Sequence, residues 1–465
     1  MKRFDGSAFS DTIPPSFLYV ASGYLLLWVA ILNGYPVFYP DSAGYLTYSF
    51  NLKQPIFRTI GYSIFIRLIN FASSPWLIVI AQSVIAIFVL YCVFKFIVRG
   101  LDQTEREALA FLGLVAFIAF GTTFPWFVGQ IMPDVFTGLT LLLLFLLLYD
   151  ADMKLGRSVL ICFVFCISIG VHVTHLLAVG AVLLTVFILG RLSAFRWLRP
   201  NRPIKGIVVL VLIPMIGVAA LTAISNWRVG SGFVLSPGKN LFLFARLMES
   251  GLAPAYLQQK CQTEELTPCK YLHNLPPTAD ELLWSSYPLL KDMGGWYGAR
   301  GEAGRIVFGT IRYSPVSFVK ECARQMFRQF VTFTPGDDNK TLSGGEINEF
   351  LELYPGEVPR YLLSRQSIGK LRKDAMRVTP IYAAVFWVSL GVCLMAPFST
   401  RLRLKVGNQL LALTLIFLFV NALATGALSG VHPRYQARAS WLMAMCCAAY
   451  LLPHVIQWRN KYPPL

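Results

Sequence analysis

The chain carries repeated apolar stretches of about 20 residues, the length that an α-helix needs to cross the hydrocarbon core of a bilayer. Of its 465 residues, 55% are hydrophobic and 14% charged, a composition that soluble globular proteins do not have. We therefore predict an all-α polytopic membrane protein with about ten transmembrane helices. No cleavage pattern follows the first apolar stretch, so it is expected to be retained. The predicted spans are residues 15–34, 75–98, 107–124, 133–150, 158–172, 174–190, 206–225, 379–397, 407–428 and 437–453.

Basic residues in the short connections define the expected orientation. Connections on one side carry Arg99 and Arg106, Lys154 and Arg157, the segments 191–205 and 401–405, and Arg459 with Lys461. By the positive-inside rule this side is the cytoplasm, and both termini are expected there. These loops account for much of the net charge of +17, which arises from 41 basic and 24 acidic residues. We therefore expect membrane lipids as partners and no nucleic acid.

A long polar insert interrupts the apolar pattern. Residues 226–377 are rich in Gly, Pro and paired charges and contain no window long enough to cross a bilayer. We predict an N-terminal transmembrane module with the first outer loop and interfacial helices, one large extracytoplasmic loop domain, and a C-terminal set of transmembrane helices. The boundaries of these three parts are residues 1–225, 226–378 and 379–465. Helical patterns within the insert cover residues 279–290, 301–313 and 315–330.

The segment 315–330 is strongly amphipathic. One stripe is apolar and includes Val316 and Phe327, whereas Lys320, Arg324 and Arg328 recur at steps of four on another. We expect a helix that lies on the membrane surface. Its cations either contact lipid phosphates or extend into the interface without a specific partner.

Two cysteines of the insert are expected to form a disulfide. Cys261 and Cys269 bracket a short polar stretch in the predicted outer loop, where an oxidising compartment permits the bond. The alternative is two free thiols in a cytoplasmic loop. Six of the nine cysteines fall inside apolar helices without the spacing of metal ligands, and there they act as small hydrophobic residues.

Two acidic residues stand at the outer ends of predicted spans. Asp41 lies in the run Tyr39-Pro40-Asp41-Ser42, and the amphipathic segment 57–71 is expected to lie in the outer interface and to present Arg58 beside it. Asp134, also preceded by proline, opens the fourth span. An ionisable group at this depth is costly unless it has a function. One carboxylate suits proton removal from an acceptor hydroxyl and the other suits orientation of acceptor or base. The alternative for each is a helix N-cap.

Further polar residues are expected at the same outer end of the spans as Asp41 and Asp134, which we call the rim. A phosphate group needs a cluster of donors, which arginine supplies in bidentate form. The candidates for binding a donor phosphate are Arg58, Arg246, Arg434 and His432. The candidates for contact with substrate are Tyr45, Tyr62, His175, Tyr435 and Gln436. The structural alternative for His432 and Arg434 is a helix cap or a contact with lipid headgroups.

The sequence contains no signature of a soluble nucleotide-dependent or metal-dependent enzyme. It has no G-x-S-x-G elbow, no glycine loop followed by Lys and Ser or Thr, and no H-E-x-x-H. His172 and His175 are close in sequence, but no third ligand has a fixed spacing to them. We therefore expect no cofactor, and a divalent metal is not indicated. A donor used at the outer face is expected to be linked to a lipid.

The first outer loop resembles that of a known superfamily. Tyr39-Pro40-Asp41-Ser42, followed by Phe57-Arg58-Thr59-Ile60-Gly61-Tyr62, is similar to the first loop of the polytopic glycosyltransferases of the C-type fold (GT-C). That superfamily includes protein O-mannosyltransferases and the bacterial aminoarabinose transferase of lipid A. Met132-Pro133-Asp134 resembles a second acidic position in some members. The D-x-D motif of metal-dependent members is absent, because Ser42 and Ala43 follow Asp41.

The resemblance implies an inverting glycosyltransferase that transfers a sugar from a polyprenyl-phosphate donor to an extracytoplasmic lipid, glycan or protein. Asp41 would be the general base and Asp134 would orient the acceptor. Arg58, Arg434 and Arg246 would neutralise the departing phosphate. The expected location is a bacterial inner membrane, with the active site on the periplasmic side. Two alternatives are a transporter of lipids or lipid-linked sugars, which the scarcity of ionisable residues within the spans disfavours, and a ligase that uses polyprenyl-diphosphate-linked glycans.

Cysteine labelling tests the predicted orientation. Ser343→Cys, in the insert, should react with a membrane-impermeant maleimide in intact spheroplasts, because the insert is expected outside the cell. Ser193→Cys, in the basic 191–205 connection, is the matched control and should react only after the membrane is permeabilised. The opposite pattern of reactivity would overturn the orientation.

Overall fold

The computed structural model describes residues 15–52, 58–70, 73–99, 107–336, 341–342, 344–399, 402 and 404–461. Within these ranges the secondary structure is helical, and strand-like pairing is limited to one parallel bridge between Val37 and Gln130. The all-α prediction is therefore confirmed for the described residues. Positions discussed above that lie outside the described residues are Phe57, Phe71, Arg106, Ser343 and Arg401.

Six of the described helical segments are long and apolar enough to cross a membrane, judged by length and composition. These segments are Pro75–Ile97, Val173–Arg191, Ile204–Arg228, Leu371–Phe398, Lys405–Ala427 and Pro433–Ile456. Shorter apolar helices occupy the other predicted positions: Ser16–Leu26, Glu107–Gly121, Val135–Tyr149 and Leu155–Gly170. The chain thus has several helices suited to a multi-pass membrane protein.

The apolar segments correspond to the following elements. In the first half they are α1 (Pro15–Leu26), α5 (Pro75–Ile97), α6 (Glu107–Gly121), α8 (Val135–Tyr149), α9 (Leu155–Gly170), α10 (Val173–Arg191), α11 (Ile204–Ile207), the π-helical η2 (Val208–Leu212) and α12 (Ile213–Arg228). After the insert they are α21 (Leu371–Met395), η4 (Ala396–Phe398), α22 (Lys405–Ala422), the π-helical η5 (Leu423–Ala427), α23 (Pro433–Ser440) and α24 (Leu442–Lys461).

Shorter helices surround this bundle. In the first half they are α2 (Trp28–Asn33), α3 (Pro40–Asn51), α4 (Gly61–Asn70), α7 (Phe124–Val128) and η1 (Ser193–Leu198). The insert contributes α13 (Lys239–Glu249), α14 (Leu252–Lys260), η3 (Thr267–Tyr271), α15 (Ala279–Trp284), α16 (Pro288–Asp292), α17 (Gly295–Tyr313), α18 (Pro315–Val331), α19 (Gly344–Leu353) and α20 (Val358–Leu362). Helices α3, α5, α18 and α23 each begin with proline, whose fixed φ suits the first helical position.

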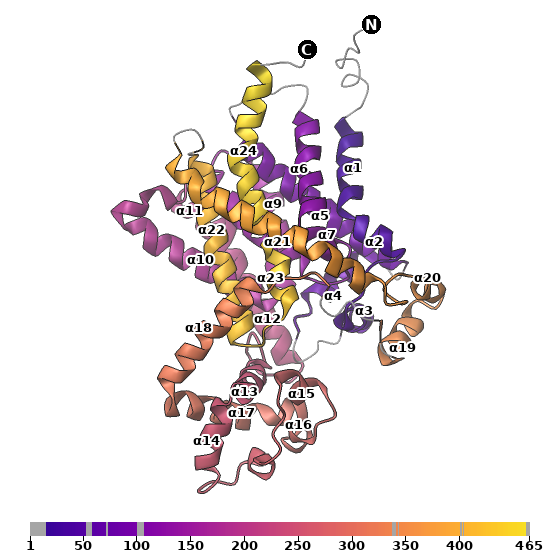
Figure 1. The fold of residues 1–465 in the computed structure, drawn as a ribbon, viewed down its shortest axis with the longest axis vertical. Coiled ribbons are helices and arrows are strands. Elements are labelled where there is room, and N and C mark those ends of the chain that lie inside the picture. The colour runs from indigo at the N-terminus through magenta and orange to yellow at the C-terminus, as the bar shows by residue number, and fades with distance from the viewer. Residues whose placement is uncertain are drawn as a thin grey trace.

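The bundle and the first part of the insert, α13 to α17, lie toward opposite ends of the molecule (Figure 1). Helices α1, α6 and α24 extend toward one end, whereas α13 to α17 form the other end. The insert itself divides between two hydrophobic cores. Leu241, Phe244 and Ile306 belong to a separate core enclosed by α13 to α17. Phe350 of α19 instead joins the main core and packs on Phe38, with ring centroids 4.9 Å apart. Residues 239–313 are therefore a compact unit, and α19 covers the first outer loop.

Helix α8 lies at the centre of the bundle, and all of its 15 residues are buried. A helix that is apolar on every side is typical of this enclosed position. The carbonyl groups of its last turn need partners from elsewhere in the chain. Arg202 Nε donates to Leu147 O at 2.7 Å. Asn201 Nδ2 donates to Tyr149 O at 2.9 Å. The basic 191–205 connection therefore fixes the C-terminal end of α8.

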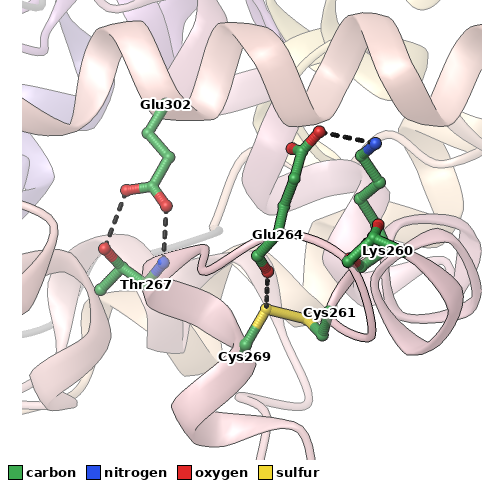
Figure 2. The surroundings of a disulfide bond; sticks show 7 residues. Lys260, Cys261, Glu264, Thr267, Cys269 and Glu302 are labelled. Atoms are coloured by element: carbon green, nitrogen blue, oxygen red, sulfur yellow. Dashed lines mark hydrogen bonds and ion pairs between the residues drawn. A yellow bond between two sulfur atoms is a disulfide. The ribbon is translucent and has the colours of Figure 1, made fainter.

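Cys261 and Cys269 form a disulfide in the compact unit, with Cα atoms 5.6 Å apart, as Figure 2 shows. The predicted pairing is confirmed. Glu302 of α17 accepts hydrogen bonds from the Thr267 backbone N–H at 2.6 Å and from its hydroxyl at 2.9 Å. The disulfide and this carboxylate together hold the turn before η3 against α17.

Helix α18 forms at the predicted position, and its buried face combines polar and apolar residues. Gln325, Gln329 and Phe330 are buried, whereas Val316 and Phe327 of the apolar stripe are exposed. Phe330 stacks on Phe419 of α22, with ring centroids 4.6 Å apart. Gln329 packs on Gly426 of η5, where an added Cβ would lie 2.6 Å from the Gln329 Cβ. The apolar stripe is therefore divided between the core and the surface of the molecule.

Loss of the disulfide should loosen the compact unit and leave the bundle unchanged. Replacing Cys261 and Cys269 together by Ser removes a constraint worth about 2–3 kcal/mol in the chain-entropy model. Hydrogen exchange followed by mass spectrometry should be faster in α14 and η3 and unchanged in α8. Cys322→Ser, at a free thiol of α18, is the control. Equal protection in the double variant and this control would contradict the expectation.

Candidate functional site

The first outer loop is attached to the turn that precedes α8. Val37 N–H donates to Gly129 O, and Ile131 N–H donates to Val37 O, both at 2.9 Å. Ser42 Oγ accepts from Tyr39 N–H and donates to Ile131 O, both at 2.8 Å. These bonds satisfy backbone groups that would otherwise be buried without partners. They bring the start of α3, with Asp41, beside the start of α8, with Asp134.

A glutamine from the far side of the insert holds the same loop. Gln366, between α20 and α21, is fully buried. Phe38 N–H donates to Gln366 Oε1 at 2.9 Å, and Gln366 Nε2 donates to Phe38 O at 2.6 Å. The side-chain amide thus pairs with the backbone of Phe38 as a neighbouring strand would. Asp41 follows three residues later, in the first turn of α3.

Arg58 forms an ion pair with Asp41, as the sequence predicted. The side chain of Asp41 is 27% exposed and therefore accessible to a ligand. Two neighbours of Arg58 determine its place: Thr59 Oγ1 donates to Val171 O at 2.9 Å, and Gly61 packs on the end of α9. A Cβ at position 61 would lie 2.2 Å from the carbonyl oxygen of Gly170, so only glycine fits there.

Asp134 stands at the N-terminus of α8 and is buried. It makes no N-cap hydrogen bond, contrary to the structural alternative. Its Oδ1 accepts a hydrogen bond from Arg438 Nη1 at 2.6 Å, and its Oδ2 lies 3.8 Å from Arg434 Nη1. A carboxylate at a helix N-terminus is also favoured by the helix dipole. Asp134 is therefore an ionic partner of α23.

Arg438 is held by a network that sequence analysis did not identify. Arg438 Nη2 donates to Asn421 Oδ1 at 3.2 Å. The amide nitrogen of Asn421 donates in turn to Gln436 Oε1 at 2.9 Å. Trp441 Nε1 donates to Arg438 O at 3.1 Å. Gln436, a candidate for substrate contact, is fully buried within this network. The sequence did contain a signal for this network: Arg438 and Asn421 lie inside apolar spans, where polar residues mark functional or paired positions.

Arg434 lies in an aromatic enclosure one turn before Arg438. Its guanidinium carbon is 3.7 Å from the centroid of the Tyr39 ring and 5.0 Å from that of Tyr435. Both distances are within the range of cation–π attraction. The buried Nε and Nη1 of Arg434 have no hydrogen-bond partner, and its side chain is 12% exposed. Arg434 thus presents unused donors at the rim, which suits an anionic ligand.

Tyr45 lies between the Asp41–Arg58 ion pair and the charged residues Asp134 and Arg434. Arg58 lies over its ring, with the guanidinium carbon 5.3 Å from the centroid. Burial raises the pKa of the Tyr45 phenol, and charged neighbours on both sides act on it as well. These neighbours are Arg58, Asp41, Asp134 and Arg434. One buried tyrosine therefore lies within the electrostatic range of both carboxylates, and Asp41, Arg58, Tyr45, Asp134 and Arg434 are grouped around it.

His432 is held by a second glutamine, Gln329 of α18. His432 N–H donates to Gln329 Oε1 at 3.0 Å, and Gln329 Nε2 donates to His432 O at 2.8 Å. This repeats the arrangement of Gln366 with Phe38. Arg434 follows two residues after His432. Both loops that carry the site are therefore held by glutamines of the insert.

Two candidates for substrate contact have partners inside the bundle. The Tyr62 hydroxyl donates to Gln82 Oε1 at 2.6 Å, and Tyr62 is fully buried. The Nδ1–H of His175 donates to Ser168 O at 2.6 Å, so Nε2 accepts from the Thr137 hydroxyl at 2.9 Å. These bonds give Tyr62 and His175 structural roles behind the rim.

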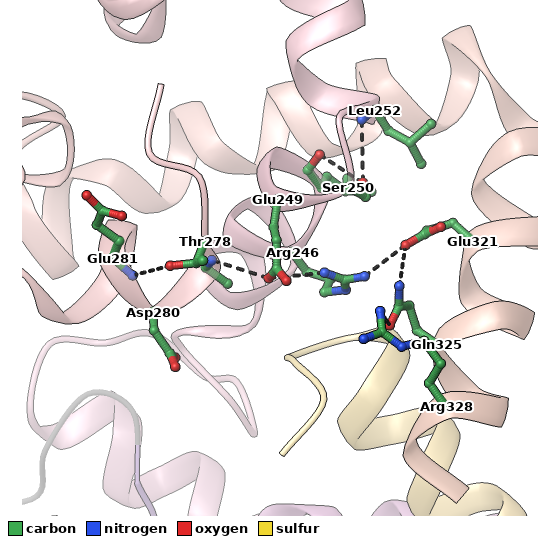
Figure 3. Close-up of polar contacts among 12 residues, drawn as sticks. Arg246, Glu249, Ser250, Leu252, Thr278, Asp280, Glu281, Glu321, Gln325 and Arg328 are labelled. Carbon is green, nitrogen blue, oxygen red and sulfur yellow. Dashed lines mark hydrogen bonds and ion pairs between the residues drawn. The ribbon is translucent and has the colours of Figure 1, made fainter. Parts of the chain in front are cut away.

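Arg246 belongs to a network within the insert (Figure 3). Its Nη1 lies 3.1 Å from Glu249 Oε2, and its Nη2 lies 2.8 Å from Glu321 Oε1. Glu321 also accepts from Gln325 Nε2 at 2.8 Å. Arg246 thus contacts two carboxylates of the insert rather than the residues around Asp41. Its place in the structure is a link between α13 and α18.

Comparison with family models, with curated proteins and with solved structures finds no match to this chain. Within the described ranges, no group of three or more His, Cys, Asp or Glu side chains has the geometry of a metal site. The information on function therefore lies in the residues of the rim.

Breaking the buried ion pair should destabilise the protein. Arg438→Met leaves the Asp134 carboxylate buried with Arg434 as its remaining cation, and such losses typically cost about 3–5 kcal/mol. The double variant Asp134→Leu with Arg438→Met should recover much of this, because no charge is left unpaired. Thermal unfolding in detergent micelles measures both.

An exposed ion pair supplies the control for this measurement. Lys260→Met removes the partner of Glu264, which is 52% exposed, and should leave the unfolding temperature nearly unchanged, because solvent screens an exposed ion pair. A loss in Arg438→Met no larger than in Lys260→Met would show that the buried pair does not stabilise the rim.

Proposed function

We propose that the chain is an inverting glycosyltransferase of the GT-C type with about ten transmembrane helices. It would use a polyprenyl-phosphate sugar at the periplasmic face of a bacterial inner membrane. The observation that carries the proposal is the meeting around Tyr45 of an accessible carboxylate, Asp41, and a partly buried arginine, Arg434, whose Nε and Nη1 make no hydrogen bond. Such a pair combines a base with a site for a phosphate leaving group.

Asp41 is the proposed general base. Its carboxylate removes the proton of an acceptor hydroxyl as the acceptor oxygen forms a bond to the anomeric carbon. The bond from that carbon to the phosphate oxygen breaks, and its electron pair stays on the departing polyprenyl phosphate. Arg58 holds one carboxylate oxygen of Asp41 and so orients the base.

Arg434 is the proposed partner of the departing phosphate. Arginine is always protonated in proteins, so Arg434 and Arg438 give two positive charges against the one negative charge of Asp134. The surplus positive charge, together with the Nε and Nη1 of Arg434, which make no hydrogen bond, supports binding of an anion. Leaving-group charge increases in the transition state, where fixed cations stabilise it most.

This geometry changes the proposed roles of two residues. Asp134 is buried against Arg438, so its proposed role is to hold the arginines of α23 rather than to orient the acceptor. Arg246 is neutralised by Glu249 and Glu321, so it is not included among the phosphate ligands. The ligase alternative needs space and charge for a second phosphate. A comparison of the binding of lipid monophosphates and lipid diphosphates would distinguish the ligase from the proposed transferase.

A pair of substitutions separates the base from the phosphate ligand. Asp41→Asn keeps the shape of the side chain but removes its basicity, so sugar transfer should fall by about 10²–10⁴ with donor binding retained. Arg434→Ala removes a charge-assisted contact made in both ground and transition states, so donor affinity and rate should fall together. Transfer in proteoliposomes and native mass spectrometry with undecaprenyl phosphate measure these effects.

Arg312→Ala supplies a control for the loss of an exposed arginine, since it lies on the outer surface of α17. It should leave both measurements unchanged. Near-normal transfer by Asp41→Asn would rule out Asp41 as the base, and wild-type protein that fails to bind undecaprenyl phosphate would argue against the proposed donor.

A further inference from the structure

The compact unit of the insert reaches the rim through α15. The carboxylate of Asp280 lies 3.8 Å from Nε2 of His432, which precedes Arg434. Figure 3 shows Asp280 on the side of α15 that faces away from the Arg246 network. Trp284 lies one helical turn after Asp280 and therefore on the same face of α15. The surface of the insert nearest the site thus carries an acidic residue followed by a tryptophan.

Aromatic side chains cluster at this surface. The ring centroids of Trp284 and Trp296 are 5.0 Å apart, and Phe242 lies 5.8 Å from Trp296 beneath them. Trp284 is 52% exposed and the adjacent Tyr297 is 54% exposed. Arg300 lies over the Tyr297 ring at 5.6 Å, which holds that ring in place. We call Trp284, Trp296 and Tyr297 the aromatic platform.

The platform lies on the part of the insert that contacts the site. Asp280, on the same face of α15 as Trp284, has its carboxylate 3.8 Å from His432 Nε2. His432 precedes Arg434, the proposed partner of the phosphate, by two residues. A ligand held on the platform would therefore lie on the side of the site that carries His432 and Arg434.

The charge around the platform distinguishes it from the lipid-facing surface of the insert. The apolar residues exposed on α18 are accompanied by Lys320, Arg324 and Arg328, which suit anionic headgroups. Beside Trp284 the charge is acidic: Asp280 is 60% exposed, and Glu281 follows it. The hydroxyl groups of a neutral polyhydroxyl ligand can donate hydrogen bonds to these carboxylates and accept them from Arg300, which lies over the Tyr297 ring.

We propose that the aromatic platform binds a carbohydrate acceptor, which makes the acceptor a glycan rather than a protein or a lipid headgroup. The proposal rests on the function proposed above and specifies its acceptor. Pyranose rings present flat C–H faces that pack on indole and phenol rings, while their hydroxyl groups bond to carboxylates at the ring edges. Asp280 is such a carboxylate on the same helix face as Trp284.

A glycan microarray of cell-envelope oligosaccharides, probed with the full-length protein in nanodiscs, tests the proposal. The wild-type protein should bind saccharides on the array. Trp284→Ala and Tyr297→Ala should each weaken this binding by about tenfold, and Trp284→Phe, which keeps an aromatic face, should retain most of it. Phe308→Ala removes a more exposed ring elsewhere on α17 and should have no effect.

Several results would overturn the proposal. These are absence of saccharide binding by the wild-type protein, or equal binding by Trp284→Ala and Phe308→Ala. A membrane-contact role would appear instead as quenching of Trp284 by brominated lipids, seen as a difference between the wild type and Trp284→Phe. Binding of undecaprenyl phosphate to the same samples reports the donor site separately. If that binding persists while saccharide binding is absent, the platform proposal fails and the proposed function does not.

Discussion

The buried ion pair between Asp134 and Arg438 is the interaction on which the rim depends. Two charges taken out of water are costly, and only close geometry with further hydrogen bonds offsets that cost. Here the 2.6 Å contact and the bond from Arg438 to Asn421 supply both. The pair joins α8 to α23 across 304 residues of sequence. Because Arg434 lies one turn before Arg438 on α23, the same pair determines where Arg434 enters the site.

Features that depend on local sequence were predicted well. Apolar windows located the helices, because burial in lipid or in a bundle requires continuous hydrophobic length. Asp41 and Arg58 were expected together because a short amphipathic segment follows the first span, and their ion pair is present. Cys261 and Cys269 are eight residues apart, so their pairing needed little knowledge of the rest of the fold.

Features that depend on distant pairing were not predicted. Arg438 and Asn421 fall within apolar runs, and nothing local indicates that a carboxylate 304 residues earlier faces one of them. Gln329 and Gln366 have ordinary surroundings in the sequence, and their role exists only after α18 and the 363–370 connection are packed. The burial of Gln325 and Gln329 on α18 was missed for the same reason, since periodicity shows that two faces differ but not which one meets the protein.

The pairing of Gln366 with Phe38 has a consequence for how the protein is made. Phe38 leaves the ribosome early, but its partner is synthesised 328 residues later. Chains fold from the N-terminus as they emerge, and contacts between distant residues wait for the later partner. The loop that carries Asp41 therefore stays without its glutamine until the chain has been synthesised beyond residue 366 and packed. A chain that stopped earlier would contain Asp41 and Asp134 but not the residue that fixes the loop before Asp41, so the candidate site is completed only late in synthesis.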